Sequence, residues 1–163
     1  LEDSSDQILF AKEIEQVLRY FSFEEARFGE DRVAFDVDID PYVEDMMMPS
    51  FLIQPLVENA VKHAMPSEGK LTIEIIGEVN GDNVLIHVKD NGVGMSEEAC
   101  KNILKPKTST TGLGIAVGNV HDRIKGFFGP ESYMSIESEQ GAGTTVTLFL
   151  ANAANTEELE GLH

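Results

Sequence analysis

The fold is decided by the stretch Gln54-Pro55-Leu56-Val57-Glu58-Asn59-Ala60-Val61-Lys62-His63, whose polar residues fall on one side of a helix. At about 100° per residue, the polar side chains occupy roughly 140° of arc and the apolar ones lie opposite. An ordinary solvated face is one interpretation of this pattern. A functional surface is the other, because the face combines an acid, an amide, an amine and an imidazole: Glu58, Asn59, Lys62 and His63.

Composition limits the class of protein. The chain has 163 residues, which suits one domain, and 12 basic against 29 acidic residues give a net charge of −17. Nucleic acid is therefore not expected as a partner, because its binding needs a basic surface. The single cysteine and the lack of zinc-site spacing favour a reducing, cytoplasmic environment. No apolar run reaches the ~20 residues of a membrane span, so we expect a soluble fragment of a longer protein.

Hydrophobic periodicity predicts the order of elements along the chain. The expected helices cover about 5–28, 55–65, 96–104 and 113–128, and the expected strands cover 32–38, 71–79, 84–88, 133–138 and 144–150. The two central strands form a hairpin with an Asn80-Gly81 turn, and residues 40–49 form a loop with three methionines. This order predicts a two-layer α/β sandwich, with a mixed, mostly antiparallel sheet and helices on one face.

Asp90 is unusual because the alternation of its strand places it on the apolar face, next to Asn91-Gly92-Val93-Gly94. A carboxylate at the edge of a core needs a hydrogen-bonding partner. Either it caps the following turn, or it receives a donor from a ligand.

Two other glycine-bearing segments accompany it, Thr111-Gly112-Leu113-Gly114 and Gly141-Ala142-Gly143-Thr144-Thr145. A glycine-rich turn is usually only a turn. The first segment has more physical support as a site, because its glycines open a helix whose free amides favour an anion such as phosphate.

Taken in order, four motifs resemble those of the ATP-binding fold shared by histidine kinases, gyrase, the mismatch-repair ATPase and a heat-shock chaperone, the GHKL superfamily or Bergerat fold. They are Glu58 to His63, Asp90 to Gly94, Gly112 to Gly114, and Gly143-Thr144. Within that superfamily, Pro49 to Asn59 and Asn119 to Ile124 resemble the autolysin-regulator (LytS-like) class of sensor histidine kinases. The spacing between Gly114 and Asn119 is closer to that of conventional histidine kinases.

The resemblance implies ATP and Mg²⁺ as cofactors. At the phosphate end, Asn59 would hold magnesium, Glu58 would order water or polarise the attacking group, and Lys62 and His63 would assist. At the base, Asp90 would accept the adenine amino group and Thr145 would support it through water. The resemblance further implies that Gly92 and Gly94 admit the base, that Met95 lines the adenine slot, that residues 105–111, with Thr110 and Thr111, form a lid, and that Gly112, Leu113 and Gly114 meet the phosphates.

The implied function is that of the ATP-binding catalytic domain of a two-component sensor histidine kinase. The γ-phosphate would go to a histidine on a domain absent from this chain, because none of the four histidines has the family's Pro-His-Phe context. Residues 1–30 would link to the dimerisation and phosphoacceptor region, 31–151 would form the catalytic domain, and 152–163 an acidic tail. The parent protein is expected to be dimeric, bound to the bacterial cell membrane, and partnered by a response regulator.

Two alternatives use the same residues. One is a serine kinase of the anti-sigma-factor type, which is a freestanding domain of the same fold. The other is a nucleotide-sensing module that binds ATP without transferring phosphate, although the presence of both Glu58 and Asn59 argues against it.

Overall fold

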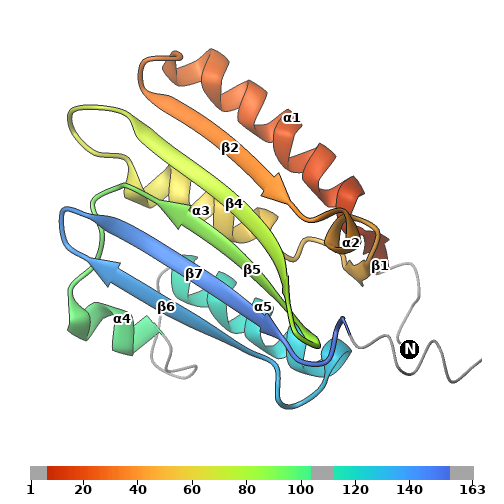
Figure 1. Cartoon of the computed structure of the whole chain (residues 1–163). Coiled ribbons are helices and arrows are strands. Elements are labelled where there is room, and N and C mark those ends of the chain that lie inside the picture. Colours follow the sequence, from red (N-terminus) through yellow and green to blue (C-terminus); the bar gives the residue numbers. More distant parts are fainter. Residues whose placement is uncertain (1–6, 104–111, 155–163) are drawn as a thin grey trace, which may run out of the picture.

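The computed structural model describes residues 7–103 and 112–154 (Figure 1). Its elements are β1 (Gln7–Leu9), α1 (Phe10–Phe28), β2 (Val33–Ile39), α2 (Pro41–Glu44), β3 (Met47–Pro49), α3 (Gln54–Ala64), β4 (Leu71–Asn80), β5 (Asn83–Asp90), α4 (Glu97–Ile103), α5 (Gly112–Phe128), β6 (Tyr133–Glu139) and β7 (Gly143–Leu150). No helix in the described ranges is both long and apolar enough to cross a membrane.

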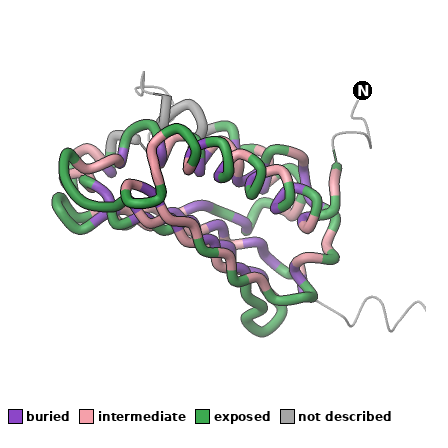
Figure 2. The backbone as a smooth tube through the Cα atoms, turned by 90° about the horizontal axis from the view of Figure 1, so that it is seen from above, coloured by how far each residue is buried: buried purple, intermediate pink, exposed green. Residues whose placement is uncertain are grey.

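The main sheet has five strands in the order β2-β4-β5-β7-β6. Only β2 and β4 are parallel; the other neighbours are antiparallel. Parallel neighbours need a long crossover, and the segment between β2 and β4 supplies it through α2, β3 and α3. Figure 2 shows the helices as one layer and the sheet as the other. The predicted two-layer α/β sandwich with a mostly antiparallel sheet is confirmed.

The core lies between these layers. On α3 the buried side chains are Leu56, Val57, Val61 and Ala64, which is the apolar face that the sequence predicts. Alternate residues of β4 and β5 face it, and each fully buried aliphatic side chain contributes about 1.5–3 kcal/mol. The buried aliphatic residues of the two strands are Leu71, Ile73, Ile75, Val84, Ile86 and Val88.

The N-terminal helix begins later than the sequence indicates. Residues Gln7–Leu9 pair antiparallel with Met47–Pro49 as a two-stranded sheet, so α1 starts at Phe10 rather than near Ser5. The expected loop at 40–49 therefore contains a short helix and a strand. The two strands have one cause, because β1 and β3 are stabilised by each other and neither carries a local signal. The short helix α2 has a local one, since Asp40 caps it and Pro41 occupies its first turn.

The central hairpin turns one residue later than predicted. Asn80 pairs with Asn83, so the two loop residues are Gly81 and Asp82 rather than Asn80 and Gly81. Gly81 has φ +63°, a left-handed conformation that glycine adopts without strain. The turn chemistry predicted the hairpin correctly, and the cross-strand packing set its register.

Candidate functional site

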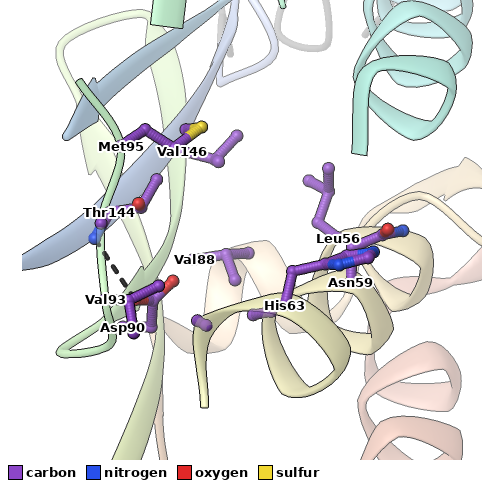
Figure 3. Close-up of a pocket in the computed structure, with 12 residues that line it drawn as sticks. Leu56, Asn59, His63, Val88, Asp90, Val93, Met95, Thr144 and Val146 are labelled. Carbon is purple, nitrogen blue, oxygen red and sulfur yellow. Dashed lines mark hydrogen bonds between the residues drawn. The ribbon is translucent and has the colours of Figure 1, made fainter. Parts of the chain in front are cut away.

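A pocket lies between α3 and the ends of β5 and β7, where Asp90 leads into the loop before α4 (Figure 3). Aliphatic side chains form most of its surface, and a few polar groups reach it from both walls. Its lining residues are Leu56, Asn59, Ala60, His63, Ala64, Val88, Asp90, Val93, Gly94, Met95, Thr144 and Val146.

From α3, Asn59 and His63 reach the pocket. They are four residues apart, which puts them one above the other on the same helix face. The Nδ2 of Asn59 donates to the carbonyl oxygen of Pro55 at 2.8 Å, which uses the amide nitrogen and leaves the amide oxygen for another partner. An amide oxygen is a hard ligand that suits Mg²⁺.

Glu58 and Lys62 do not line this pocket. Each precedes a pocket residue by one position, and that step of about 100° turns them toward the neighbouring flank of α3. They line a separate groove between α1 and α3, where Tyr20 and Arg27 form the opposite side. The carboxylate of Glu58 accepts a hydrogen bond from Gln54 Nε2 at 2.9 Å. The four residues predicted as one catalytic group are thus divided between two surfaces.

On the sheet side, Asp90 is 8% exposed. Its Oδ1 accepts hydrogen bonds from the backbone N–H of Gly92 at 2.8 Å and of Thr144 at 3.3 Å. Burial raises the pKa of this carboxyl, and the two backbone hydrogen bonds act in the opposite direction. Within the described ranges no protein donor contacts Oδ2. Asp90 therefore caps the turn with one oxygen and has the other available for a ligand, so the two interpretations from the sequence are compatible.

Thr144, rather than the predicted Thr145, lies beside Asp90. In the β5–β7 ladder, Thr144 is opposite Asp90 and Thr145 is opposite Lys89. Residues directly opposite each other share a face of the sheet, so Thr145 points away from the pocket and Thr144 points toward it. The alternation of β7 contains a signal for this choice, because Thr144 shares the period of the buried residues Val146, Leu148 and Leu150.

Gly92 and Gly94 have a structural requirement within the chain itself. A Cβ at Gly92 would overlap the carbonyl group of Ala64 at the end of α3. At Gly94, where φ is +70°, a Cβ would overlap the carbonyl oxygen of Glu139. The two glycines let the loop pack against α3 and against the β6–β7 turn, which shapes this wall of the pocket.

Some of the remaining predicted site residues lie within the described ranges, and others do not. Met95 lines the pocket, and its backbone N–H donates to Ser138 Oγ at 2.7 Å. The segment Gly112 to Gly114 forms the first turn of α5, as the glycine pattern predicts. Thr110, Thr111 and the rest of the expected lid at 105–111 lie outside the described residues.

Six aliphatic lining residues were not individually assigned to the site from the sequence: Leu56, Ala60, Ala64, Val88, Val93 and Val146. Strand alternation contains a signal for two of them, because Val88 shares a face with Asp90 and Val146 shares a face with Thr144. Within the described residues no group of three or more His, Cys, Asp or Glu side chains is arranged to hold a metal ion. A metal here would need ligands from a bound phosphate as well as from Asn59.

Comparison with known proteins adds three findings. Residues 46–154 match the family model of the Histidine kinase-, DNA gyrase B-, and HSP90-like ATPase. The sensor protein LytS of Staphylococcus epidermidis is 36% identical over 156 residues, which cover 94% of this chain and 26% of that protein. The chain thus spans about a quarter of the length of the curated relatives it matches.

Among solved structures, the catalytic domain of histidine kinase ThkA has a TM-score of 0.62 at 19% identity, over 88% of this chain and 92% of that one. The crystal structure of ThkA in complex with response regulator protein TrrA also has a TM-score of 0.62 at 19% identity, over 88% of this chain and 40% of that one. At 19% identity, the similarity of these two structures to this chain is a similarity of fold.

Proposed function

This chain belongs to the family of histidine kinase-, DNA gyrase B- and HSP90-like ATPases, and from this we propose that it is the ATP-binding catalytic domain of a sensor histidine kinase. It binds ATP with Mg²⁺ and transfers the γ-phosphate to a histidine on another domain. The similarity to LytS over nearly the whole chain supports this proposal over the other family members.

The single observation that carries the proposal is the buried carboxylate of Asp90 in the wall of an aliphatic pocket, where the turn uses its Oδ1 and, within the described residues, no protein donor uses its Oδ2. A flat, largely apolar base with an exocyclic amino group suits such a pocket, because the rings cover the aliphatic walls and the amine donates to the carboxylate. Adenine has this amine, whereas guanine presents a carbonyl oxygen at the corresponding position. Thr144, opposite Asp90, is the polar neighbour on the same face.

The phosphates would extend toward α3 and the start of α5. Asn59 and His63 lie on the α3 wall, and the first turn of α5 presents backbone amides at Gly112 to Gly114. Bound magnesium would neutralise charge on the phosphates. In a chain with net charge −17, such local positive partners matter, since the surface as a whole repels a nucleotide.

Glu58 and Lys62 would act toward the protein substrate. They lie on the exposed flank of α3, next to the pocket residues, with the groove beside α1 in front of them. Glu58 is thus available to orient or polarise an incoming histidine side chain, and Lys62 adds a positive charge. This role is compatible with their absence from the pocket lining.

For the whole protein we propose the arrangement implied by its relatives. Residues 1–30 connect to a dimerisation and phosphoacceptor region, 31–151 form the catalytic domain and 152–163 a tail. The parent is a dimeric sensor in the bacterial cell membrane, its catalytic domain is in the cytoplasm, and its phosphohistidine serves a response regulator. The complex of ThkA with a response regulator protein supports the last point.

The test is a phosphotransfer assay. The purified chain is mixed with γ-labelled ATP, Mg²⁺ and a separately produced histidine-bearing domain, with Asn59→Ala as the negative control. We expect an acid-labile, base-stable phosphohistidine on the second domain. A phosphoserine would instead support an anti-sigma-factor type of kinase, and ATP binding without transfer to any partner would support a nucleotide-sensing module.

A further inference from the structure

A buried acid outside the pocket holds the start of α3. Glu13 lies on α1 and is 0% exposed. Its Oε1 accepts a hydrogen bond from the backbone N–H of Leu52 at 3.0 Å, and its Oε2 accepts from those of Ile53 at 2.7 Å and Gln54 at 3.0 Å. One carboxylate thus satisfies three consecutive backbone donors, 39 to 41 residues away in the sequence.

These donors need a partner because the first N–H groups of a helix have none within it. The N-cap residue, Ile53, has no side chain that could accept them, and α3 has no acidic residue in its first turn. Glu13 on α1 therefore performs the role that an N-cap side chain usually performs. Burial raises the pKa of Glu13, whereas the three backbone hydrogen bonds and the nearby charge of Arg123 lower it.

Arg123, on α5, holds the carbonyl groups just before the same helix. Its Nη1 donates to the carbonyl oxygen of Phe51 at 3.0 Å, and its Nη2 donates to that of Ser50. Phe51 has φ +57°, which is uncommon for a residue with a side chain. The segment 50–54 is therefore held on its carbonyl side by α5 and on its amide side by α1. We call this pair, Glu13 and Arg123, the α3 clamp.

The other end of α3 is fixed by the loop that follows β5. The carbonyl oxygen of Ala64 accepts a hydrogen bond from the backbone N–H of Val93 at 3.0 Å, beside the close contact at Gly92. Asn59 lies five residues after Gln54, about 7.5 Å along the helix axis at ~1.5 Å per residue. A tilt at the clamped end would therefore move Asn59 relative to Asp90, which stands on the opposite wall.

We propose that Glu13 and Arg123 are positioning residues for the nucleotide pocket. By fixing the first turn of α3, the clamp sets the distance and angle at which Asn59 and His63 face Asp90. The inference deepens the proposed function and rests on it. It makes α1, and the part of α5 that carries Arg123, parts of the frame that aligns the phosphate side of the site.

The experiment compares two clamp variants with two controls. Glu13→Gln and Arg123→Gln remove the charges, and Glu15→Gln and Arg19→Gln remove matched charges at exposed positions of α1. In the nucleotide-free proteins, nuclear magnetic resonance follows amide hydrogen exchange at residues 52–54 and the side-chain amide signal of Asn59. Calorimetry then gives the ATP dissociation constant with Mg²⁺ and with a chelator.

For Glu13→Gln we expect exchange at residues 52–54 to accelerate at least about tenfold. Both clamp variants should shift the Asn59 signal and lower the gain in ATP affinity from Mg²⁺ by about tenfold or more, because small misplacements of aligned groups are costly. Both controls should behave as the wild type. If the clamp only stabilised the fold, neither the gain in ATP affinity from Mg²⁺ nor the Asn59 signal would change.

Unchanged exchange in Glu13→Gln overturns the proposal. So does faster exchange when the Asn59 signal and the gain from Mg²⁺ remain as in the wild type. If Glu13→Gln does not fold, Arg123→Gln decides by the same two measurements, because its side chain is only partly buried. If the wild type binds no ATP, the proposed function fails, and the Asn59 signal in the nucleotide-free variants still decides whether the clamp positions α3.

Discussion

Asp90 joins a structural role and a ligand role in one side chain. Its Oδ1 accepts hydrogen bonds from the backbone amides of Gly92 and Thr144, which fixes the carboxylate plane. A fixed plane determines where Oδ2 lies and therefore where a donor on a ligand must be. Specificity by such a group is strong, because a ligand without the donor leaves a buried acceptor unpaired.

Asp90→Asn should lower the preference for adenine over guanine nucleotides. The amide can still accept from Gly92 and Thr144 through its oxygen, but its NH₂ then faces the adenine amine. We expect the ADP dissociation constant to rise by about tenfold or more, with less change for GDP. Calorimetry with ADP and GDP tests this, with the exposed Asp36→Asn as the control. An unchanged ratio of the two constants would remove Asp90 from base recognition.

The pKa of Asp90 also gives a pH dependence of stability. Burial raises this pKa above its ordinary value of 3.8, so the folded protein binds more protons than the unfolded chain between 3.8 and the raised pKa. Stability must then fall as pH increases through that window. The wild type should lose free energy of unfolding relative to Asp90→Asn over this range and level off above it. Urea unfolding of both proteins, from below pH 3.8 to neutrality, measures this loss. A difference in free energy of unfolding between wild type and Asp90→Asn that stays constant with pH would contradict the prediction.

Gly92 and Gly126 provide a matched pair of glycines. A Cβ at Gly92 overlaps the Ala64 carbonyl group, whereas a Cβ at Gly126, within α5, meets nothing within 4 Å. We expect Gly92→Ala to lower the free energy of unfolding by about 1–3 kcal/mol and Gly126→Ala to raise it by about 0.5–1 kcal/mol. Equal effects in urea unfolding would mean that the loop adapts to the extra carbon.

At the scale of elements, α3 turns a single polar stripe into two surfaces. Sequence periodicity predicts that Glu58, Asn59, Lys62 and His63 share the side opposite the core. It does not tell which neighbours flank that side. The ends of β5 and β7 face Asn59 and His63, and α1 faces Glu58 and Lys62, so tertiary packing divides one stripe between a pocket and a groove.

Asn59→Ala and Glu58→Gln should therefore have different effects. Asn59→Ala is expected to abolish the Mg²⁺-dependent part of nucleotide binding with the fold intact, since Asn59 is only partly buried. Glu58→Gln should leave nucleotide affinity unchanged and reduce phosphotransfer. Calorimetry and the transfer assay separate the two, with circular dichroism as the folding control. Unfolding of Asn59→Ala would make that residue structural, and a loss of ATP affinity in Glu58→Gln would place Glu58 at the nucleotide.

The beginning of α1 illustrates what local pattern misses. Phe10, Ile14, Val17 and Phe21 repeat at helical spacing and are buried, yet the helix starts only at Phe10 and not near Ser5. Residues Gln7–Leu9 form a strand because Met47–Pro49 offers them backbone partners. The contact between Glu13 and the start of α3 could not be predicted from local pattern either, because its three backbone donors are about forty residues away in sequence.

For the whole molecule, the family and the two-layer fold were predictable because several motifs agree in order with the hydrophobic periods. The position of Asp90 was also predictable, since strand alternation placed a carboxylate on the core face. The choice of Thr144 over Thr145 was predictable by the same alternation, since Thr144 shares a face with the buried Val146, Leu148 and Leu150. The pairing of β1 with β3 and the anchoring of α3 by Glu13 depend on contacts between residues far apart in sequence, and these features required the structure.

The central claim is that the pocket between α3 and the ends of β5 and β7 binds an adenine nucleotide with magnesium. The most direct measurement is a titration of the isotope-labelled chain with Mg²⁺–ATP, followed by nuclear magnetic resonance. We predict saturable shifts at the backbone amides of Gly92, Met95 and Thr144 and at the side-chain amide of Asn59, with much weaker effects from GTP. Shifts confined to the groove around Tyr20 and Lys62, or no saturable shifts at all, would contradict the claim.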